Sequence, residues 1–140
     1  MTPARDPDKL PPWMRWAMGA TAAMNLVGAF AFVPAAGAVR RLAGFPEDAH
    51  PLYMLTFGAF VFVFGAAYLV TARSGRADRT FIGVAAAGKL AFFGLLIGLW
   101  IAGDLPGRAL LAGAGDGVFG AIFAAWLVRT NGRLRRDAGR

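Results

Sequence analysis

Four long apolar stretches, separated by short polar segments, dominate the pattern of residues along this chain. They cover about residues 13–33, 52–72, 80–102 and 108–129. Each is close to the ~20 residues that an α-helix needs to cross a ~30 Å hydrocarbon layer. All four are far longer than strands of ~4–8 residues, and none shows the alternation of a membrane barrel. The pattern therefore predicts an all-α fold, an integral membrane four-helix bundle.

Polar tails flank these spans. Residues 1–12 are rich in proline and lack apolar periodicity, and residues 130–140 are strongly basic. A chain of 140 residues has room for one domain, so we expect a single transmembrane domain over residues 13–129.

The first connection, residues 35–51, contains a short amphipathic segment. Its apolar face holds Val39, Leu42 and Phe45, and the two arginines displaced from that face are Arg40 and Arg41. We expect a short helix that lies in the membrane interface and ends near Gly44 and Pro46.

The composition agrees with a lipid environment and limits the chemistry. Hydrophobic residues make up 57% of the chain and charged residues 16%, more apolar surface than a soluble domain of this size can bury. Because there are no cysteines, disulfides, thiol catalysis and Cys-ligated metal centres are excluded. The single histidine, His50, lies beside two acidic residues. A solvated loop histidine is favoured there over a metal or pigment ligand, and we expect no cofactor or metal.

The net charge of +7 comes from residues in the loops and tails, so it indicates membrane topology and not nucleic-acid binding. Eleven Lys and Arg residues fall on one side of the predicted membrane and three on the other. The eleven are Arg5, Lys9, Arg15, Arg73, Arg76, Arg79, Arg129, Arg133, Arg135, Arg136 and Arg140; the three are Arg40, Arg41 and Arg108. This asymmetry predicts a multi-pass protein of the cytoplasmic (inner) membrane with both termini in the cytoplasm. Aromatic residues near the two boundaries agree: Trp13, Trp16, Tyr68 and Trp126 on the cytoplasmic side, Tyr53 and Trp100 on the other.

Anionic lipid headgroups are the partners expected for the cytoplasmic arginines. The candidates are Arg73, Arg76, Arg79, Arg133, Arg135 and Arg136.

Small residues recur along the last two spans and predict close helix packing. The candidates are Gly94 and Gly98 in the third span, and Gly113, Gly117 and Ala121 in the fourth. The tight turn at residues 103–107 makes these two spans an antiparallel hairpin. The second span instead carries several phenylalanines, some of which must face lipid or a partner protein.

One glycine motif requires a choice between two interpretations. Residues 115–120 read GDGVFG and match the G-x-G-x-x-G pattern of dinucleotide sites. Such a site needs a preceding strand and a helix N-terminus in water, but this match lies inside an apolar span. Helix packing is therefore the favoured interpretation.

Three strongly polar residues, Asn25, Lys89 and Asp116, lie inside the spans. Counted at ~1.5 Å per residue from the cytoplasmic boundary, they lie about 18, 14 and 20 Å deep, which is near mid-membrane. Charges at that depth are costly and tend to pair inside a bundle. We therefore predict an ion pair between Lys89 and Asp116.

Four interpretations of this cluster remain open. It can fix helix register, form a pocket for a small polar or amphipathic ligand with Thr56 as a further lining residue, or belong to a proton or ion pathway. Enzymatic chemistry is the least supported, because no metal-ligand set and no nucleophile with an evident base accompany the cluster.

Several short motifs resemble a group of small bacterial four-span membrane proteins that are broadly DoxX-like. The residues that carry the resemblance are Pro51, Leu52, Gly58, Gly65, Tyr68, Gly88, Lys89 and Asp116. The resemblance covers most of residues 13–129 and implies the four-helix layout; it implies no mechanism for any residue.

Two functions follow from these observations. The first is a non-enzymatic accessory or scaffold subunit that packs in a membrane complex or a homo-oligomer. The alternative is a small-molecule-binding or transport bundle built on Asn25, Lys89 and Asp116.

Overall fold

The computed structural model describes residues 9–47 and 49–138, with side chains as far as Gly132. Five α-helices and two short 3₁₀ helices make up the described chain, and none of it forms a strand. In order they are α1 (Pro12–Ala29), η1 (Phe30–Phe32), η2 (Pro34–Ala36), α2 (Gly37–Ala43), α3 (Pro51–Ser74), α4 (Arg79–Ala102) and α5 (Gly107–Ala138).

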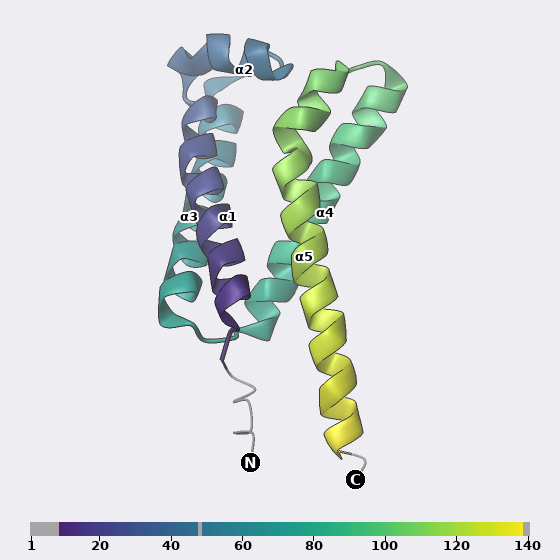
Figure 1. The fold of residues 1–140 in the computed structure, drawn as a ribbon. Coiled ribbons are helices and arrows are strands. Elements are labelled where there is room, and N and C mark those ends of the chain that lie inside the picture. Colours follow the sequence, from purple (N-terminus) through teal and green to yellow (C-terminus); the bar gives the residue numbers. More distant parts are fainter. Residues whose placement is uncertain (1–8, 48, 139–140) are drawn as a thin grey trace.

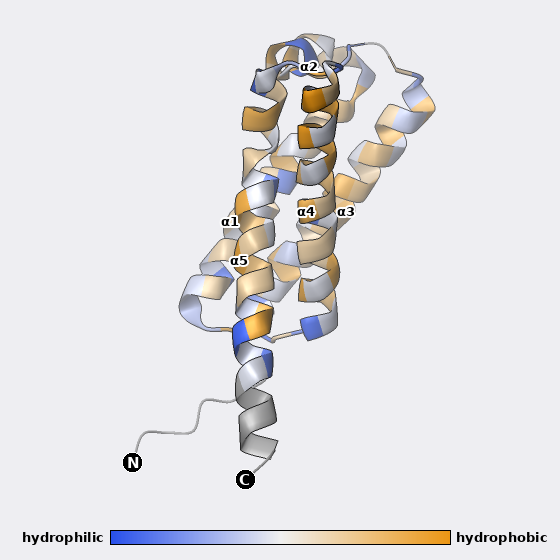
Figure 2. Ribbon diagram, turned by 90° about the vertical axis from the view of Figure 1, so that its right-hand side faces the viewer, coloured by the Kyte–Doolittle hydropathy of each residue, from blue (hydrophilic) through white to orange (hydrophobic). Residues whose placement is uncertain are grey.

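The described helices are those of a multi-pass membrane protein. Three segments are long and apolar enough to cross a membrane: Pro51–Ser74, Arg79–Ala102 and Gly107–Gly132. The number of candidate spans becomes four when Pro12–Phe32 and Pro34–Ala43 are taken as one span. These two segments meet at a bend of 95°. Figure 2 shows hydrophobic residues along the length of the helices and hydrophilic residues mainly at the two ends of the molecule.

Local sequence explains where the helices begin and end. His50 and Asp78 act as N-caps of α3 and α4, because their side chains accept hydrogen bonds from the amides of Leu52 and Phe81. Both helices end at a glycine in the left-handed region, Gly75 with φ +66° and Gly103 with φ +85°. His50 is thus a helix cap in the structure.

The predicted first span is shorter and more bent than expected. α1 gives way to the 3₁₀ turn η1 after Ala29, and the chain turns at Pro34, which has no amide hydrogen to continue a helix. The short helix α2 follows, as the amphipathic pattern predicted.

The structure also differs from the sequence prediction at the two tails. Leu10 is buried and its amide donates to the Gly75 carbonyl at 2.8 Å, so the end of the N-terminal segment is docked. At the other end, α5 continues as helix to Ala138, well past the predicted boundary at 129. The remainder of each tail lies outside the described residues.

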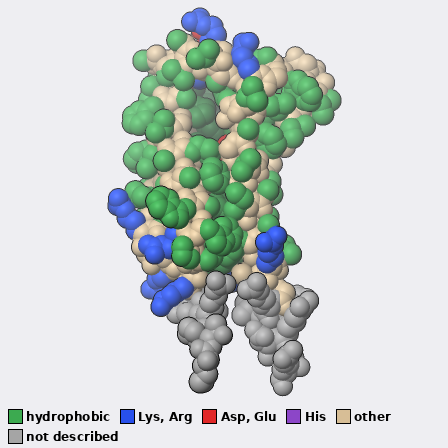
Figure 3. All heavy atoms as spheres, viewed as in Figure 1, with side chains coloured by type: hydrophobic (Ala, Val, Ile, Leu, Met, Phe, Trp, Pro, Cys, Tyr) green, Lys and Arg blue, Asp and Glu red, His purple; other side chains and the backbone are tan. Residues whose placement is uncertain are grey.

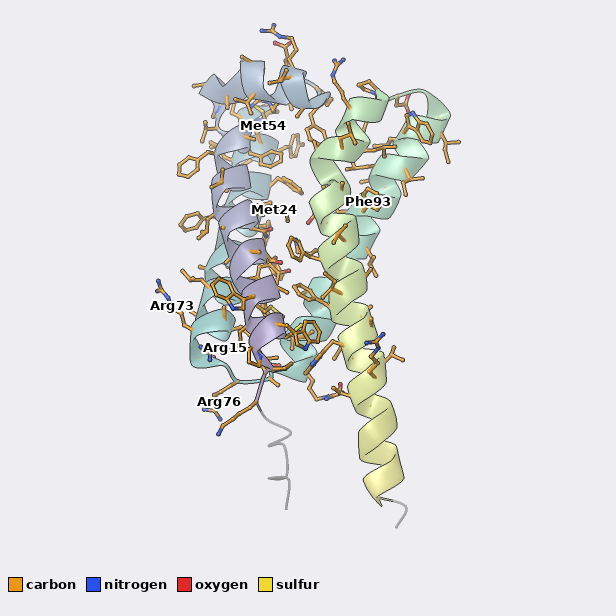
Figure 4. All side chains as sticks on the ribbon, in the orientation of Figure 1. Arg15, Met24, Met54, Arg73, Arg76 and Phe93 are labelled. Atoms are coloured by element: carbon orange, nitrogen blue, oxygen red, sulfur yellow. The ribbon has the colours of Figure 1, made fainter. Side chains whose placement is uncertain are left out.

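The long helices form two closely packed antiparallel pairs, α1 with α3 and α4 with α5 (Figure 1). Between the pairs, the backbone contacts are few and connect α5 with α1 and α2. α2 lies across one end of the molecule, almost perpendicular to the long helices. The opposite end holds the start of α1, the loop between α3 and α4, and the arginines Arg15, Arg73 and Arg76 (Figure 4).

The buried core joins the two pairs only over the half of the molecule near this arginine end. Its largest fully buried side chains include Met14 and Met18 of α1, Tyr68 of α3, Ile82 of α4 and Phe123 of α5. Tyr68 and Trp126 are 2% and 6% exposed, so the expectation that they belong to an aromatic belt is wrong. Trp13 and Trp16, by contrast, are exposed, as a belt requires.

The tightest contacts of α4 with α5 lie at glycines of α5. A Cβ on Gly117 would lie 2.7 Å from Phe93, and one on Gly120 would lie 2.9 Å from Leu90. Gly113 likewise meets the side chain of Leu96. Side chains of α4 therefore fill the grooves that these glycines leave in α5.

The predicted packing residues therefore divide into two groups within this chain, because Gly113 and Gly117 pack against α4 and the other three do not. Gly94 and Gly98 are exposed, and no atom lies within 4 Å of the position of a Cβ on either. Ala121 is also exposed, because the contact face of α5 runs through Gly120. Spacing reveals a smooth helix face without revealing which way that face points.

Candidate functional site

The three polar residues from separate spans meet in the structure. Lys89 Nζ lies 2.6 Å from Asp116 Oδ1 and donates a second hydrogen bond to Asn25 Oδ1 at 3.3 Å. The ammonium group also lies 5.4 Å from the centre of the Tyr68 ring, within the range of a cation–π contact. The Lys89 side chain is 5% exposed and the Asp116 side chain 22%.

Every long helix helps to position this cluster. Asn25 comes from α1, Lys89 from α4 and Asp116 from α5. Asn25 is held in turn by α3, because its Nδ2 donates to the Val61 carbonyl at 3.4 Å. The cluster thus connects the two helix pairs near the middle of the molecule.

A cavity of about 430 Å³ lies beside the cluster, between the two helix pairs. This volume falls within the ~300–1,000 Å³ typical of small-molecule sites. The cavity walls are apolar and largely aromatic, and the polar groups are few. Its lining includes Met24, Gly28, Phe32, Phe57, Phe60, Phe64, Tyr68, Phe92, Asn25, Lys89, Asp116 and Arg40.

The cavity presents one free acceptor on the ion pair. Asp116 uses Oδ1 to accept from Lys89, and among the described residues its second oxygen, Oδ2, has no hydrogen-bond partner. Lys89 already binds both Asp116 and Asn25. A ligand that reaches the cluster therefore meets a carboxylate oxygen.

Side chains bound the cavity at both ends. The buried core of Met18, Tyr68, Ile82 and Phe123 closes the end near the arginines. At the other end, the cavity lining continues into α2 and the residue Phe45.

Arg40 holds α2 in place at this end of the cavity. Its side chain is 4% exposed, and its guanidinium donates to the carbonyls of Ala31, Val33 and Glu47 at 2.8 Å each. Its Nε atom is buried without a partner. Sequence reasoning placed Arg40 on the polar side of α2. The carbonyls released where the helix breaks at Pro34 were the available signal that a buried donor is needed there.

The cavity instead reaches the surface sideways, between helices. Figure 3 shows a hollow on the face between α1 and α5, surrounded by hydrophobic side chains. On the opposite side, the described backbones of α3 and α4 do not come into contact. Only side chains bridge these two helices, with ring centres 6.0 Å apart for Phe57 and Phe92 and 6.4 Å apart for Phe64 and Phe81.

Between these two aromatic bridges lies an opening that we call the α3–α4 window, formed by Phe60, Val84 and Gly88. All three line the cavity and are exposed, Phe60 by 62% and Val84 by 54%. No atom lies within 4 Å of a Cβ position at Gly88. At the window, the lining of the cavity that contains Lys89 and Asp116 therefore reaches the outer, apolar surface of the helices.

Other predicted site residues lie away from the cavity. Thr56 is exposed and does not line it. Arg73 and Arg76 are exposed at the far end. Arg79 donates to Asn131 and stacks over Trp126, so it is engaged within the chain. The side chains of Arg133, Arg135 and Arg136 lie outside the described residues.

The G-x-G-x-x-G match lies within α5 and not at a helix N-terminus. Its glycines admit neighbouring side chains: Gly115 meets Met24 of α1, which points toward α5 in Figure 4, and Gly117 and Gly120 meet α4. The geometry is that of helix packing, the interpretation favoured from the sequence.

Comparison of the chain with protein-family models, curated proteins and solved structures gives no match. The resemblance to DoxX-like proteins therefore stays a prediction. Two of its glycines have a structural role, because a Cβ on Gly58 would lie 3.0 Å from Phe32 and one on Gly65 3.0 Å from Leu26. Both allow α3 to pack closely against the segment from α1 to η1.

Proposed function

We propose that this protein binds a membrane-dissolved small molecule in the cavity between its two helix pairs, with the polar end of that molecule at Lys89 and Asp116. The single observation that carries the proposal is a half-open apolar cavity of about 430 Å³ that ends at a buried ion pair. The buried core at the arginine end and the exposed lining residues between the helices favour binding from the bilayer over passage of a solute across it.

The proposal includes four membrane crossings in a helix bundle, with both termini in the cytoplasm of a bacterial cell and the chain in the inner membrane. The exposed arginines Arg15, Arg73, Arg76 and Arg129 support it, because basic residues concentrate on the cytoplasmic side of short loops. In this orientation α2 lies at the opposite membrane surface. Arg73 and Arg76 are then free to bind anionic headgroups.

Identification of the small molecules that remain bound to the purified protein tests this function. The wild-type protein, extracted in native lipid nanodiscs, should carry a small molecule enriched over the surrounding lipid. Gly88→Phe places a ring in the α3–α4 window, where a side chain has room, and should remove that enrichment. Gly94→Phe is the matched control, on the same helix, equally open and outside the cavity lining. Equal recovery from both variants and the wild type would contradict the proposal.

A second candidate, an accessory or scaffold subunit or a homo-oligomer, is supported by the outer face of α4. Ala87, Ala91, Gly94 and Gly98 lie on one exposed side of that helix, and helices associate in lipid through such small residues. Gly94→Leu combined with Gly98→Leu should then release a bound partner or copy during mild purification. A wild-type protein that is monomeric at native expression would rule this candidate out.

A further inference from the structure

The polar atoms that a ligand can reach in the cavity restrict its chemical class. The charges of Lys89 and Asp116 cancel within the pair, and the Lys89 ammonium is already bound to two side-chain oxygens. Arg40 offers nothing further, because its terminal nitrogens donate to carbonyls and its Nε atom is buried. The free acceptor is Asp116 Oδ2, on a side chain that is 22% exposed. Beside it, among the described residues, Lys89 keeps a third N–H and Asn25 a second amide N–H, so a ligand group that both donates and accepts matches the cluster.

Charged headgroups fit this arrangement poorly. An anionic headgroup would lie beside the Asp116 carboxylate and be repelled by it, and drawing Lys89 away would leave one buried charge without its partner. A cationic headgroup would compete with Lys89 for the same carboxylate, 2.6 Å from the ammonium. A neutral hydroxyl group avoids both problems, because it donates to Oδ2 and leaves the ion pair intact.

The α3–α4 window restricts the apolar part of the ligand. Phe60, Val84 and Gly88 open onto the surface that faces the hydrocarbon layer in the proposed orientation, at the level of Lys89. A molecule that enters there must first dissolve in the bilayer. Its apolar part must then pack against the phenylalanine side chains that line the cavity.

We infer that the ligand class of this cavity is a neutral, membrane-dissolved lipid with a hydroxyl headgroup, which enters through the α3–α4 window and donates a hydrogen bond to Asp116 Oδ2. This inference rests on the proposed function and specifies its ligand. It assigns Gly88 as the residue that keeps the entrance open and Asp116 as the residue that selects the headgroup.

Photocrosslinking with three probes of the same chain length tests the inference. The probes are diazirine-bearing hexadecanol, hexadecanoic acid and hexadecylamine, each added at the same mole fraction to nanodiscs that contain the protein. Mass spectrometry then locates the labelled residues. Hexadecanol should label cavity residues of α3 and α4 about tenfold more than either charged probe, the selectivity expected from one hydrogen bond to a charged acceptor.

Two variants separate entry from headgroup selection. Gly88→Phe should abolish cavity labelling by all three probes, and the control Gly94→Phe should leave it unchanged. The double variant Lys89→Met, Asp116→Leu removes both charges together, which spares the fold an unpaired charge; it should keep labelling but lose the preference for the alcohol.

The outcomes distinguish this inference from the function on which it rests. Equal labelling by the three probes, or a preference for the acid or the amine, would overturn the headgroup assignment while leaving a ligand cavity in place. Cavity labelling that survives Gly88→Phe would overturn the entry route. No cavity labelling by any probe would overturn the proposed function and this inference together.

Discussion

Lys89 Nζ and Asp116 Oδ1 lie 2.6 Å apart across the α4–α5 hairpin, with the lysine side chain almost fully buried. A pair in such surroundings contributes little net stability, because desolvation offsets the attraction, but removal of one partner leaves an uncompensated charge. The stability of the protein therefore requires both residues or neither, independently of any role of the pair in ligand binding.

We expect Lys89→Met to lower the free energy of unfolding by about 3–5 kcal/mol, because Asp116 then stays buried without its partner. Adding Asp116→Leu should restore most of that loss. Reversible unfolding in mixed micelles measures both values. A double variant as unstable as the single one would show that the pair itself stabilises the fold.

Arg40 is expected to hold α2 over the end of the cavity. Arg40→Met should destabilise this segment by on the order of 3 kcal/mol, because carbonyls of Ala31, Val33 and Glu47 lose a charged donor. Hydrogen exchange over residues 30–47 should rise accordingly. The neighbouring Arg41→Met breaks only an exposed ion pair with Glu47 and should cost less than about 1 kcal/mol. Equal exchange in the two variants would argue against this role.

The packing of α5 against α4 predicts opposite responses at two glycines. Gly117→Val should destabilise the protein by about 1–3 kcal/mol, since its Cβ would lie 2.7 Å from the Phe93 ring. Gly98→Val meets open space and should change the unfolding free energy by less than about 0.5 kcal/mol in a monomer. Thermal unfolding in detergent compares them directly. A strong effect at Gly98 would instead indicate that a partner covers this face.

The orientation can be tested with single cysteines, because the chain has none of its own. Arg76→Cys lies in the loop between α3 and α4, and Asp104→Cys lies in the loop between α4 and α5; both positions are exposed. In intact cells, a membrane-impermeant maleimide should label Cys at position 104 and spare position 76. The reverse pattern would place both termini outside.

The sequence predicts those features of the fold and the site that depend on local pattern. It does not predict those that depend on contacts between helices. Helix positions follow from the apolar runs and from the tight turn at residues 103–107. The pairing of Lys89 with Asp116 followed from their similar depth and the short turn between their helices. Both inferences needed only distances along single helices.

Sequence reasoning failed where the direction of a helix face decided the outcome. Tyr68 was assigned to the membrane boundary, yet it turns inward and contacts Lys89. Gly94 and Gly98 are predicted to pack against a helix, and within this chain they face outward while α4 presents larger side chains to α5. Arg40 is placed on a polar face by the amphipathic pattern, but its side chain turns inward to the carbonyls released near Pro34.

The cavity between the helix pairs is the central feature, and a structure of the protein determined in lipid nanodiscs tests it most directly. We predict an elongated density that enters through the α3–α4 window and ends within hydrogen-bond distance of Asp116 Oδ2. A structure in which α3 and α4 close on each other, with Gly88 packed against α3 and no space beside Lys89, would contradict the account.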